Sequence, residues 1–309
     1  MEASSYHTPV LVADVLAHLI TARDGLYVDG TVGGGGHAEA ILETITPGGR
    51  LIGLDVDEDA LRAAGSRLQK FGPRVILVRA NFRDLDQIVR EQGASVDGIL
   101  LDLGVSSFQL DDPAKGFSFR SDERLDMRMD RRVTTDARAV VNTYTEQQLA
   151  LIFMQYGEER KAGPIARAIV RERQRAPIET TGQLAAIVER TAGPAFLPKT
   201  LSRVFQAVRI EVNGELESLR EAIVRGLDVV RPGGRFVILS YHSLEDRIVK
   251  EEFRKASATV QRAAHHLLPD VMLHPRIRLL TKKPVVAGRE ETRANPRARS
   301  AKLRAAERI

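Results

Sequence analysis

The first hundred positions alternate short apolar runs with amphipathic stretches. Four runs rich in Val, Ile and Leu have the length of buried strands, and each ends at a polar or glycine-rich turn. Strands that alternate with helical stretches predict a parallel α/β sheet, in which ligands bind at the carboxyl ends of the strands. The four predicted strands are residues 26–30, 51–55, 75–78 and 96–103.

The pattern changes after Gln109, and from about Asp111 to Arg203 it is helical with no convincing strand. Thr145 with Gln148, and Thr180 with Gln183, have the spacing of capping boxes, and apolar residues follow each pair at helical intervals. The pattern therefore predicts an all-helical domain inserted into the sheet domain. We place the insert at 111–205 and the sheet domain at 1–110 and 206–309.

The sheet pattern resumes after the insert. An amphipathic helix is predicted to end at 231–234, and a fifth strand to follow at 235–239. Ser243 is placed to cap the next helix, with Asp246 at the reciprocal position. The end of the chain carries two further short strand patterns, at 277–281 and 302–307.

Composition narrows the class of protein. The 309 residues are 43% hydrophobic and 28% charged and include no cysteine, which excludes disulfides and thiolate metal sites. No basic leader precedes Arg23 and no apolar run is long enough for a bilayer, so we expect a cytoplasmic protein.

The basic residues concentrate at the carboxyl terminus. Residues 276–309 hold 11 Lys and Arg against 3 acidic residues, whereas the whole chain carries only +5. A basic end on a slightly acidic body suggests a polyanionic partner, because Lys and Arg displace counterions from phosphates. On charge alone, a solvated tail explains the segment equally well.

The clearest chemical signal is Asp29-Gly30-Thr31-Val32 followed by four glycines and His37, directly after the first predicted strand. Asp55 ends the second strand, where a carboxylate can accept both hydroxyls of a ribose. The glycines also fit the fingerprint of NAD-binding folds. Antiparallel final strands and the lack of a second mononucleotide-binding half favour a methyltransferase.

Two further residues follow predicted strands. Phe82 comes after the third strand, where its ring can stack on an adenine, although an ordinary core position explains it as well. Asp102 ends the fourth strand, a position that in methyltransferases lies between the methyl donor and the acceptor; a helix cap is its structural alternative.

Taken together, these segments resemble the bacterial 16S ribosomal RNA (cytosine-N4)-methyltransferase family. The resemblance covers nearly the whole chain in one order, which no single glycine loop can match in specificity. The segments that carry it are 7–11, 27–31, 35–37, 98–107, 109–111, 116–119, 125–129, 156–160, 205–210, 242–247 and 295–300.

The resemblance implies a class I, Rossmann-like methyltransferase fold with an inserted helical domain that recognises the substrate, and S-adenosylmethionine as donor. It implies N4-methylcytidine in the decoding region of 16S rRNA as the product, within the small subunit or its assembly intermediate. A cytoplasmic location and a possible homodimer come with it. The cofactor contacts carried over by motif are Gly35, Gly36, His37, Asp55, Phe82, Asp102 and Gln109.

One departure affects the mechanism. Many amino-group methyltransferases carry Asp/Asn-Pro-Pro-aromatic after the fourth strand, whereas this chain continues from Asp102 with Leu-Gly-Val-Ser. We therefore name Asp102, Ser106, Ser107 and His242 as catalytic candidates, with loop-stabilising or helix-start roles as alternatives for the last three. The remaining histidines lack metal-ligand spacing, so no metal is predicted.

Three other functions compete with this interpretation. A DNA cytosine-N4 methyltransferase would share the chemistry, but no DNA-recognition module is evident. A non-catalytic factor that binds S-adenosylmethionine and ribosomal RNA would keep the cofactor residues without turnover. An NAD-dependent oxidoreductase would share only the glycine loop.

Overall fold

The computed structural model describes residues 9–93, 95–105, 115–193, 197–261 and 270–309. Contacts divide the chain into two compact units, a sheet unit of 1–104 with 216–309 and a helical unit of 105–215. Within the described ranges, no helix combines the length and apolarity that crossing a bilayer requires.

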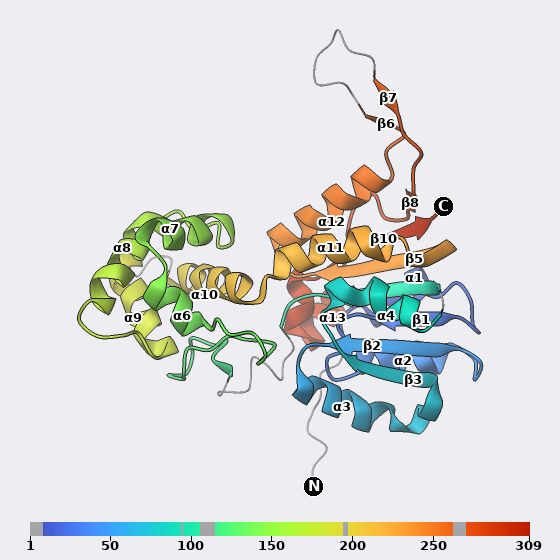
Figure 1. Ribbon diagram of the computed structural model, residues 1–309, viewed down its shortest axis with the longest axis horizontal. Helices are drawn as coiled ribbons and strands as arrows, with labels where there is room; N and C mark the ends of the chain where they lie inside the picture. The colour runs from blue at the N-terminus through green and yellow to red at the C-terminus, as the bar shows by residue number, and fades with distance from the viewer. Residues whose placement is uncertain (1–8, 94, 106–114, 194–196, 262–269) are drawn as a thin grey trace. The chain divides into compact units, whose positions relative to one another are not determined.

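The sheet unit is built on one mixed sheet with the strand order β3-β2-β1-β4-β5-β10-β8, and β9 pairs with β10 (Figure 1). Strands β1 to β5 run parallel, whereas β10 is antiparallel to β5, β8 and β9. This topology confirms the predicted Rossmann-like α/β class. The strands are β1 Leu26–Asp29, β2 Arg50–Asp55, β3 Val75–Arg79, β4 Val96–Asp102, β5 Val230–Ser240, β8 Ile277–Leu279, β9 Val285–Val286 and β10 Lys302–Arg308.

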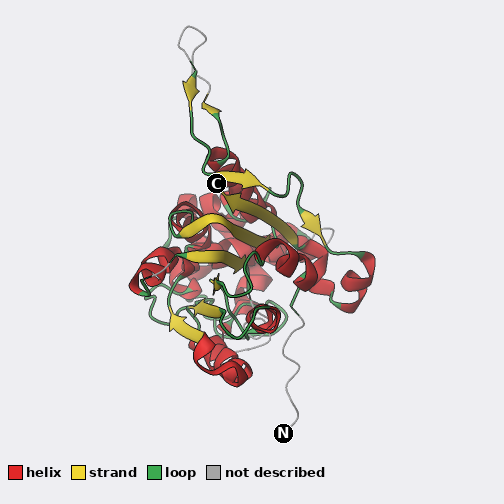
Figure 2. Ribbon diagram, turned by 90° about the vertical axis from the view of Figure 1, so that its right-hand side faces the viewer, coloured by secondary structure: helices red, strands yellow, loops and turns green. Residues whose placement is uncertain are grey.

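Helices cover both faces of this sheet (Figure 2), and consecutive residues of its central parallel strands are buried, as expected for strands covered on each side. One face packs against α1 (Val12–Leu19), α2 (Gly36–Thr44) and α3 (Glu58–Leu68) in a single core cluster. The other face meets α11 (Glu215–Gly226) and α12 (Ser243–Ala256). The ring centroids of Phe236 in β5 and Phe253 in α12 lie 6.1 Å apart. The remaining helices of the unit are η1 Gln69–Arg74, η2 Phe82–Asp84, α4 Leu85–Glu91, α13 Arg289–Ala294 and η5 Pro296–Ser300.

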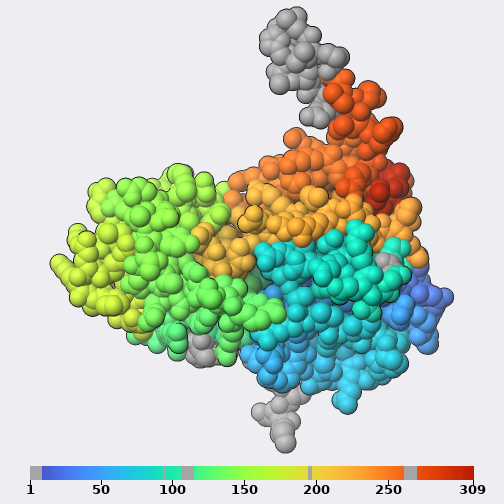
Figure 3. Space-filling model, viewed as in Figure 1, coloured from blue at the N-terminus to red at the C-terminus, as the bar shows by residue number. Residues whose placement is uncertain are grey.

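A two-stranded ribbon of β6 (Val260–Gln261) and β7 (Val271–Met272) follows α12. Figures 1 and 3 show it standing away from the rest of the sheet unit. Val271 and Met272 are exposed on it.

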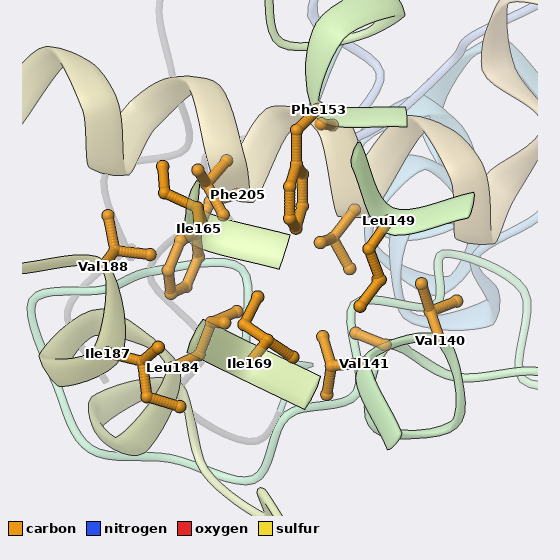
Figure 4. Close-up of a cluster of buried hydrophobic side chains, with 14 of the residues drawn as sticks. Val140, Val141, Leu149, Phe153, Ile165, Ile169, Leu184, Ile187, Val188 and Phe205 are labelled. Carbon is orange, nitrogen blue, oxygen red and sulfur yellow. The ribbon is translucent and has the colours of Figure 1, made fainter. Parts of the chain in front are cut away.

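The helical unit is organised around one apolar core, to which Phe153, Ile165 and Phe205 contribute from three helices (Figure 4). The capping boxes predicted at Thr145 and Thr180 are both present, each with its Gln side chain returned to the cap backbone. The helices are α6 Ala137–Thr143, α7 Glu146–Gln155, α8 Ala162–Arg173, α9 Thr181–Ala192 and α10 Leu197–Asn213.

Three predicted boundaries lie elsewhere in the structure. The expected domain boundary at 205/206 falls inside α10, because the apolar positions of that helix continue unbroken to Val212. Helix α11 ends at Gly226 and not at 231–234, which belong to β5 beside a register shift opposite β4. Ser243 does not cap α12: His242 caps it, with Glu245 as the reciprocal residue.

The helical core yields a stability test. Replacing the fully buried Phe153 with Ala removes a ring from this core and leaves a cavity, so we expect the free energy of unfolding to fall by about 3–5 kcal/mol. Its neighbour Met154 is 56% exposed, and Met154→Ala should change the same quantity by less than about 0.5 kcal/mol. Guanidinium unfolding of both variants measures this difference; equal losses would contradict the described core.

Candidate functional site

The carboxyl ends of the parallel strands bring together residues that are far apart in the sequence. Asp29 ends β1, Asp55 ends β2 and Asp102 ends β4, and the glycine-rich turn joins β1 to α2. Because β1 pairs with both β2 and β4, the three carboxylates share one edge of the sheet. This is the edge at which the sequence predicted ligand binding.

Asp102 has three contacts within the sheet unit. Its backbone N–H donates to Thr31 Oγ1 at 2.6 Å, which fixes the end of β4 to the glycine-rich turn. The Tyr241 hydroxyl donates to Asp102 Oδ1 at 2.7 Å, and His37 Nδ1 lies 3.4 Å from Oδ2. The carboxylate therefore has one fixed partner on each oxygen and is not a helix cap.

His37 links this carboxylate to the beginning of the described chain. Its ring is buried, and Nε2 lies 2.9 Å from the carbonyl oxygen of Val10. A carbonyl only accepts, so Nε2 carries a proton, which leaves Nδ1 to face Asp102. Burial alone would lower the pKa of His37, but the hydrogen bond and charge of Asp102, with the charge of Asp29, outweigh it and raise that pKa. The imidazolium form thus stabilises negative charge at Asp102.

Asp29 lies beneath this network with 1% of its surface exposed. Burial raises the pKa of Asp29 to about 7, against the opposing charge of His37 and a hydrogen bond from the Thr31 backbone. The protonated form of Asp29 is therefore well populated near neutral pH. Its place below Thr31 suits a residue that supports the turn.

Asp55 accepts one backbone hydrogen bond on each carboxylate oxygen, from Gly33 N–H at 2.9 Å and from Asp57 N–H at 2.9 Å. Burial raises the pKa of Asp55 to about 6, although these hydrogen bonds oppose the rise. Each oxygen keeps a second lone pair, so the carboxylate is oriented but not saturated.

The glycines of the turn serve different purposes. Gly35 caps α2 at φ +81°, and a Cβ there would lie 3.3 Å from the Ala64 backbone of α3. Gly33 adopts φ +50°, but a Cβ there would meet only the Thr31 carbonyl, at 3.8 Å. The turn is therefore packed where α2 begins and open beside Asp55. Gly36 is the first residue of α2 and precedes His37.

Phe82 begins η2 at the end of β3, and a Cβ added to Gly30 would lie 3.2 Å from the Phe82 Cβ. The structure thus brings Phe82 to the end of β1, at the edge of the sheet that carries the three carboxylates. Its role in stacking on adenine stays a prediction.

His242 lies just beyond β5, one residue from Tyr241, and is only 13% exposed. Its Nδ1 accepts the Glu245 N–H at a long 3.5 Å, and its Nε2 lies 3.1 Å from Glu245 Oε1. Both contacts belong to the start of α12. The structure therefore supplies the helix-start role, and a catalytic role for His242 stays a prediction.

Three predicted residues, Ser106, Ser107 and Gln109, lie outside the described residues. Sequence reasoning missed Tyr241, whose hydroxyl holds Asp102 from the neighbouring strand. Its position at the end of β5 was the available signal, because all parallel strands deliver their carboxyl ends to one edge. Among the described residues there is no group of three or more His, Asp or Glu arranged to hold a metal ion.

The residues present fit S-adenosylmethionine, the donor implied by the sequence. Asp55 offers two oriented oxygens to ribose hydroxyls, and the turn beside it is open at Gly33. Phe82 offers a ring at the next strand end, and Asp102 keeps its carboxylate partly exposed. These groups supply an acceptor pair, an apolar wall and a negative charge around one edge.

The sheet unit has the features that define an S-adenosylmethionine-dependent methyltransferase. These are a parallel sheet that ends in antiparallel β10, a glycine-rich turn after β1 and a carboxylate at the end of β2. The sequence model of the MraW methylase family matches residues 4–309, and the chain belongs to that family. It is 49% identical to the "Ribosomal RNA small subunit methyltransferase H" of Carboxydothermus hydrogenoformans, over 98% of each chain. The protein of that name from Syntrophus aciditrophicus is also 49% identical, over 99% of this chain and 98% of its own. The predicted family and enzyme class are confirmed.

The raised pKa of Asp55 predicts how donor binding depends on pH. We expect the ribose hydroxyls to donate to the ionised Asp55 carboxylate, and with a pKa of about 6 most of that form is lost at pH 5. We expect the Kd for S-adenosylmethionine to rise about tenfold from pH 7 to pH 5. Isothermal titration calorimetry across this range measures the change.

Two substitutions separate the carboxylates in that titration. Asp55→Asn should weaken binding at pH 7 and abolish the dependence centred near pH 6, since no titrating oxygen remains. Asp29→Asn should keep the dependence, because Asp29 supports Thr31 rather than the open face of the turn. A pH dependence that survives Asp55→Asn but disappears with Asp29→Asn would show that Asp29, and not Asp55, controls donor binding.

Proposed function

We propose that this protein transfers a methyl group from S-adenosylmethionine to the exocyclic N4 amine of one cytidine in the decoding region of 16S rRNA. One observation carries the proposal: over nearly its full length, the chain is 49% identical to two relatives that are named as small-subunit ribosomal RNA methyltransferases. The edge of the sheet supports it with a carboxylate fixed for use beside an open turn. Membership of a methylase family favours turnover over a non-catalytic RNA-binding factor.

The cofactor would be held by the glycine-rich turn and the neighbouring strand ends. Asp55 would accept the ribose hydroxyls, Phe82 would border the adenine, and Gly35, Gly36 and His37 would line the start of α2. Gln109 belongs to the same set by resemblance. When bound, the cofactor supplies an electrophilic methyl group on a sulfonium cation.

The chain's own task is to make a poor nucleophile react. The N4 lone pair of cytosine is delocalised into the ring, and an acceptor on its N–H favours a more tetrahedral nitrogen. Asp102 would accept that hydrogen bond, and the contacts of its two oxygens with Tyr241 and His37 support this role because they orient the carboxylate. In-line attack then needs the amine at about 3–3.5 Å from the methyl carbon.

Asp102 also suits the charge that develops. The amine becomes cationic as the new bond forms, and a carboxylate hydrogen-bonded to it stabilises that charge without serving as a strong base. The proton leaves after transfer. The Ser106 and Ser107 hydroxyls are further candidates for accepting a hydrogen bond from the amine, and His242 is a candidate for orienting the base or accepting this proton.

The target base must be single-stranded or turned out of its stack to reach a carboxylate at the sheet edge. We assign substrate recognition to the helical unit. The substrate would be the small ribosomal subunit or an assembly intermediate, the location would be the cytoplasm, and the protein would act as a monomer or a homodimer.

A transfer assay tests the proposal. Labelled S-adenosylmethionine and the protein are incubated with small subunits from cells that lack this activity, and the nucleosides are separated by chromatography and mass. We expect label in N4-methylcytidine at one position of 16S rRNA. Subunits from cells that retain the activity are the matched control and should accept little label, because their site is already modified. Label on a ring carbon or a ribose, or none despite donor binding, would contradict the proposal.

A further inference from the structure

Residues 289–300 of the basic carboxyl-terminal segment lie at the edge of the sheet that carries the site. Helices α13 and η5 directly precede β10, whose first residue, Lys302, lies opposite Ser240, the last residue of β5. Tyr241 follows Ser240, so η5 reaches the edge where Tyr241 holds Asp102. Figure 1 draws α13 at this end of the sheet unit.

This segment is anchored to the rest of the sheet unit. Glu291 Oε1 accepts the backbone N–H of Leu11 at 2.7 Å, next to Val10, which contacts His37. Ala298 is 1% exposed within the core cluster, and Asn295 Oδ1 accepts the Arg297 N–H to cap η5. The backbone that carries the arginines of this segment is therefore held by the rest of the sheet unit.

Arg297 lies within electrostatic reach of the site. The pKa of the Tyr241 phenol is raised by burial first, then by the charge and hydrogen bond of Asp102, and the positive charge of Arg297 opposes that rise. Arg297 is half-buried, whereas Arg293 and Arg299 are exposed on either side of it in the sequence. We call these three residues the basic edge.

Four other basic residues near the end of the chain have ion-pair partners within the sheet unit. Arg276 pairs with Asp228 and Arg278 with Glu307, at the opposite end of β10. Lys302 and Arg304 both pair with Asp246 of α12. In the part of the chain that the structure describes, Arg293 and Arg299 have no carboxylate within ion-pair distance, so positive charge is left at the basic edge.

We propose that the basic edge, Arg293, Arg297 and Arg299, binds the phosphodiester backbone of RNA beside the nucleotide whose base enters the site. The proposal rests on the proposed function and adds which part of the protein contacts the strand next to the target. Guanidinium groups suit phosphate because they donate two parallel hydrogen bonds and stay charged at any physiological pH. A flexible single strand needs such contacts to hold its register while one base is turned into the site.

The test compares two doubly substituted proteins with the same reduction in charge. Arg297→Gln with Arg299→Gln removes two of the proposed phosphate-binding groups at the edge that carries Asp102. Arg276→Gln with Arg278→Gln removes two arginines from the opposite end of β10. Each of them forms an ion pair within the protein, and the loss of an exposed ion pair costs little stability. Thermal unfolding confirms that both proteins are folded.

Transfer to small subunits that lack the modification is measured from low to high salt. For the basic-edge variant we expect kcat/KM for subunits to fall at least tenfold at about 100 mM salt, with the Kd for S-adenosylmethionine unchanged. Its log–log salt slope should become shallower by about 1.4, or about 0.7 for each phosphate of a single strand that is no longer neutralised. For the control variant, kcat/KM should stay within about twofold of the value for the protein without substitutions, and the salt slope should be the same. Equal effects in both variants, or no change in slope, would overturn the proposal.

Filter binding to protein-free 16S rRNA gives a second readout that does not need turnover. The same reduction in affinity for the basic-edge variant there assigns the interaction to RNA. A reduction with whole subunits but not with protein-free rRNA would assign the edge to a ribosomal protein and overturn the proposal. If the unmodified protein binds rRNA through the basic edge but transfers no methyl group, the proposed function fails and this inference stands.

Discussion

The arrangement of the site depends on how the Asp102 carboxylate is held at the end of the central strand β4. Three elements hold this residue. Thr31 of the glycine-rich turn fixes the backbone, Tyr241 at the end of β5 donates to one oxygen, and His37 of α2 faces the other. A charge so held can act on a substrate without first having to be desolvated and oriented.

Much of the sheet unit can be understood as support for this arrangement. The turn after β1 is held at both ends, since Gly30 N–H donates to Leu100 of β4 and Gly33 N–H donates to Asp55 of β2. The segment before α1 accepts a hydrogen bond from His37 and donates one to Glu291, which joins the start of the described chain to α13. Because β10 is antiparallel to β5, it begins at that edge, and the basic residues that directly precede it lie there.

Local signals were sufficient to predict most of the elements. The apolar runs and the turn residues that bound them predicted the parallel strands. The two capping boxes of the insert were predictable because each needs only four consecutive residues. The cap of α12 was misplaced by one residue because Ser243 is the stronger capping type, whereas the protein uses His242 with buried Glu245. The end of the insert was misplaced because the resemblance motif begins at Phe205, although helical spacing continues through Val208 and Val212.

The candidate site was predictable as a set of strand ends but not as a set of contacts. The rule that parallel strands end together was enough to group Asp55, Phe82 and Asp102. The partner of Asp102 was not predictable, because Tyr241 is 139 positions away and only the three-dimensional pairing of β4 with β5 brings the two together. Long-range side-chain partners of this kind depend on register and rotamer, which no local pattern encodes.

The different roles of Asp55 and Asp102 are what most need a direct measurement. Single-turnover transfer from labelled S-adenosylmethionine would be followed with Asp55→Asn and Asp102→Asn at rising donor concentration. We expect Asp55→Asn to approach the unmodified rate once the donor saturates. Asp102→Asn should stay at least about a hundredfold slower at every donor concentration, the cost of removing one preorganised charged acceptor. Full recovery of Asp102→Asn at high donor concentration would contradict these roles, because Asp102 would then serve only to bind the cofactor.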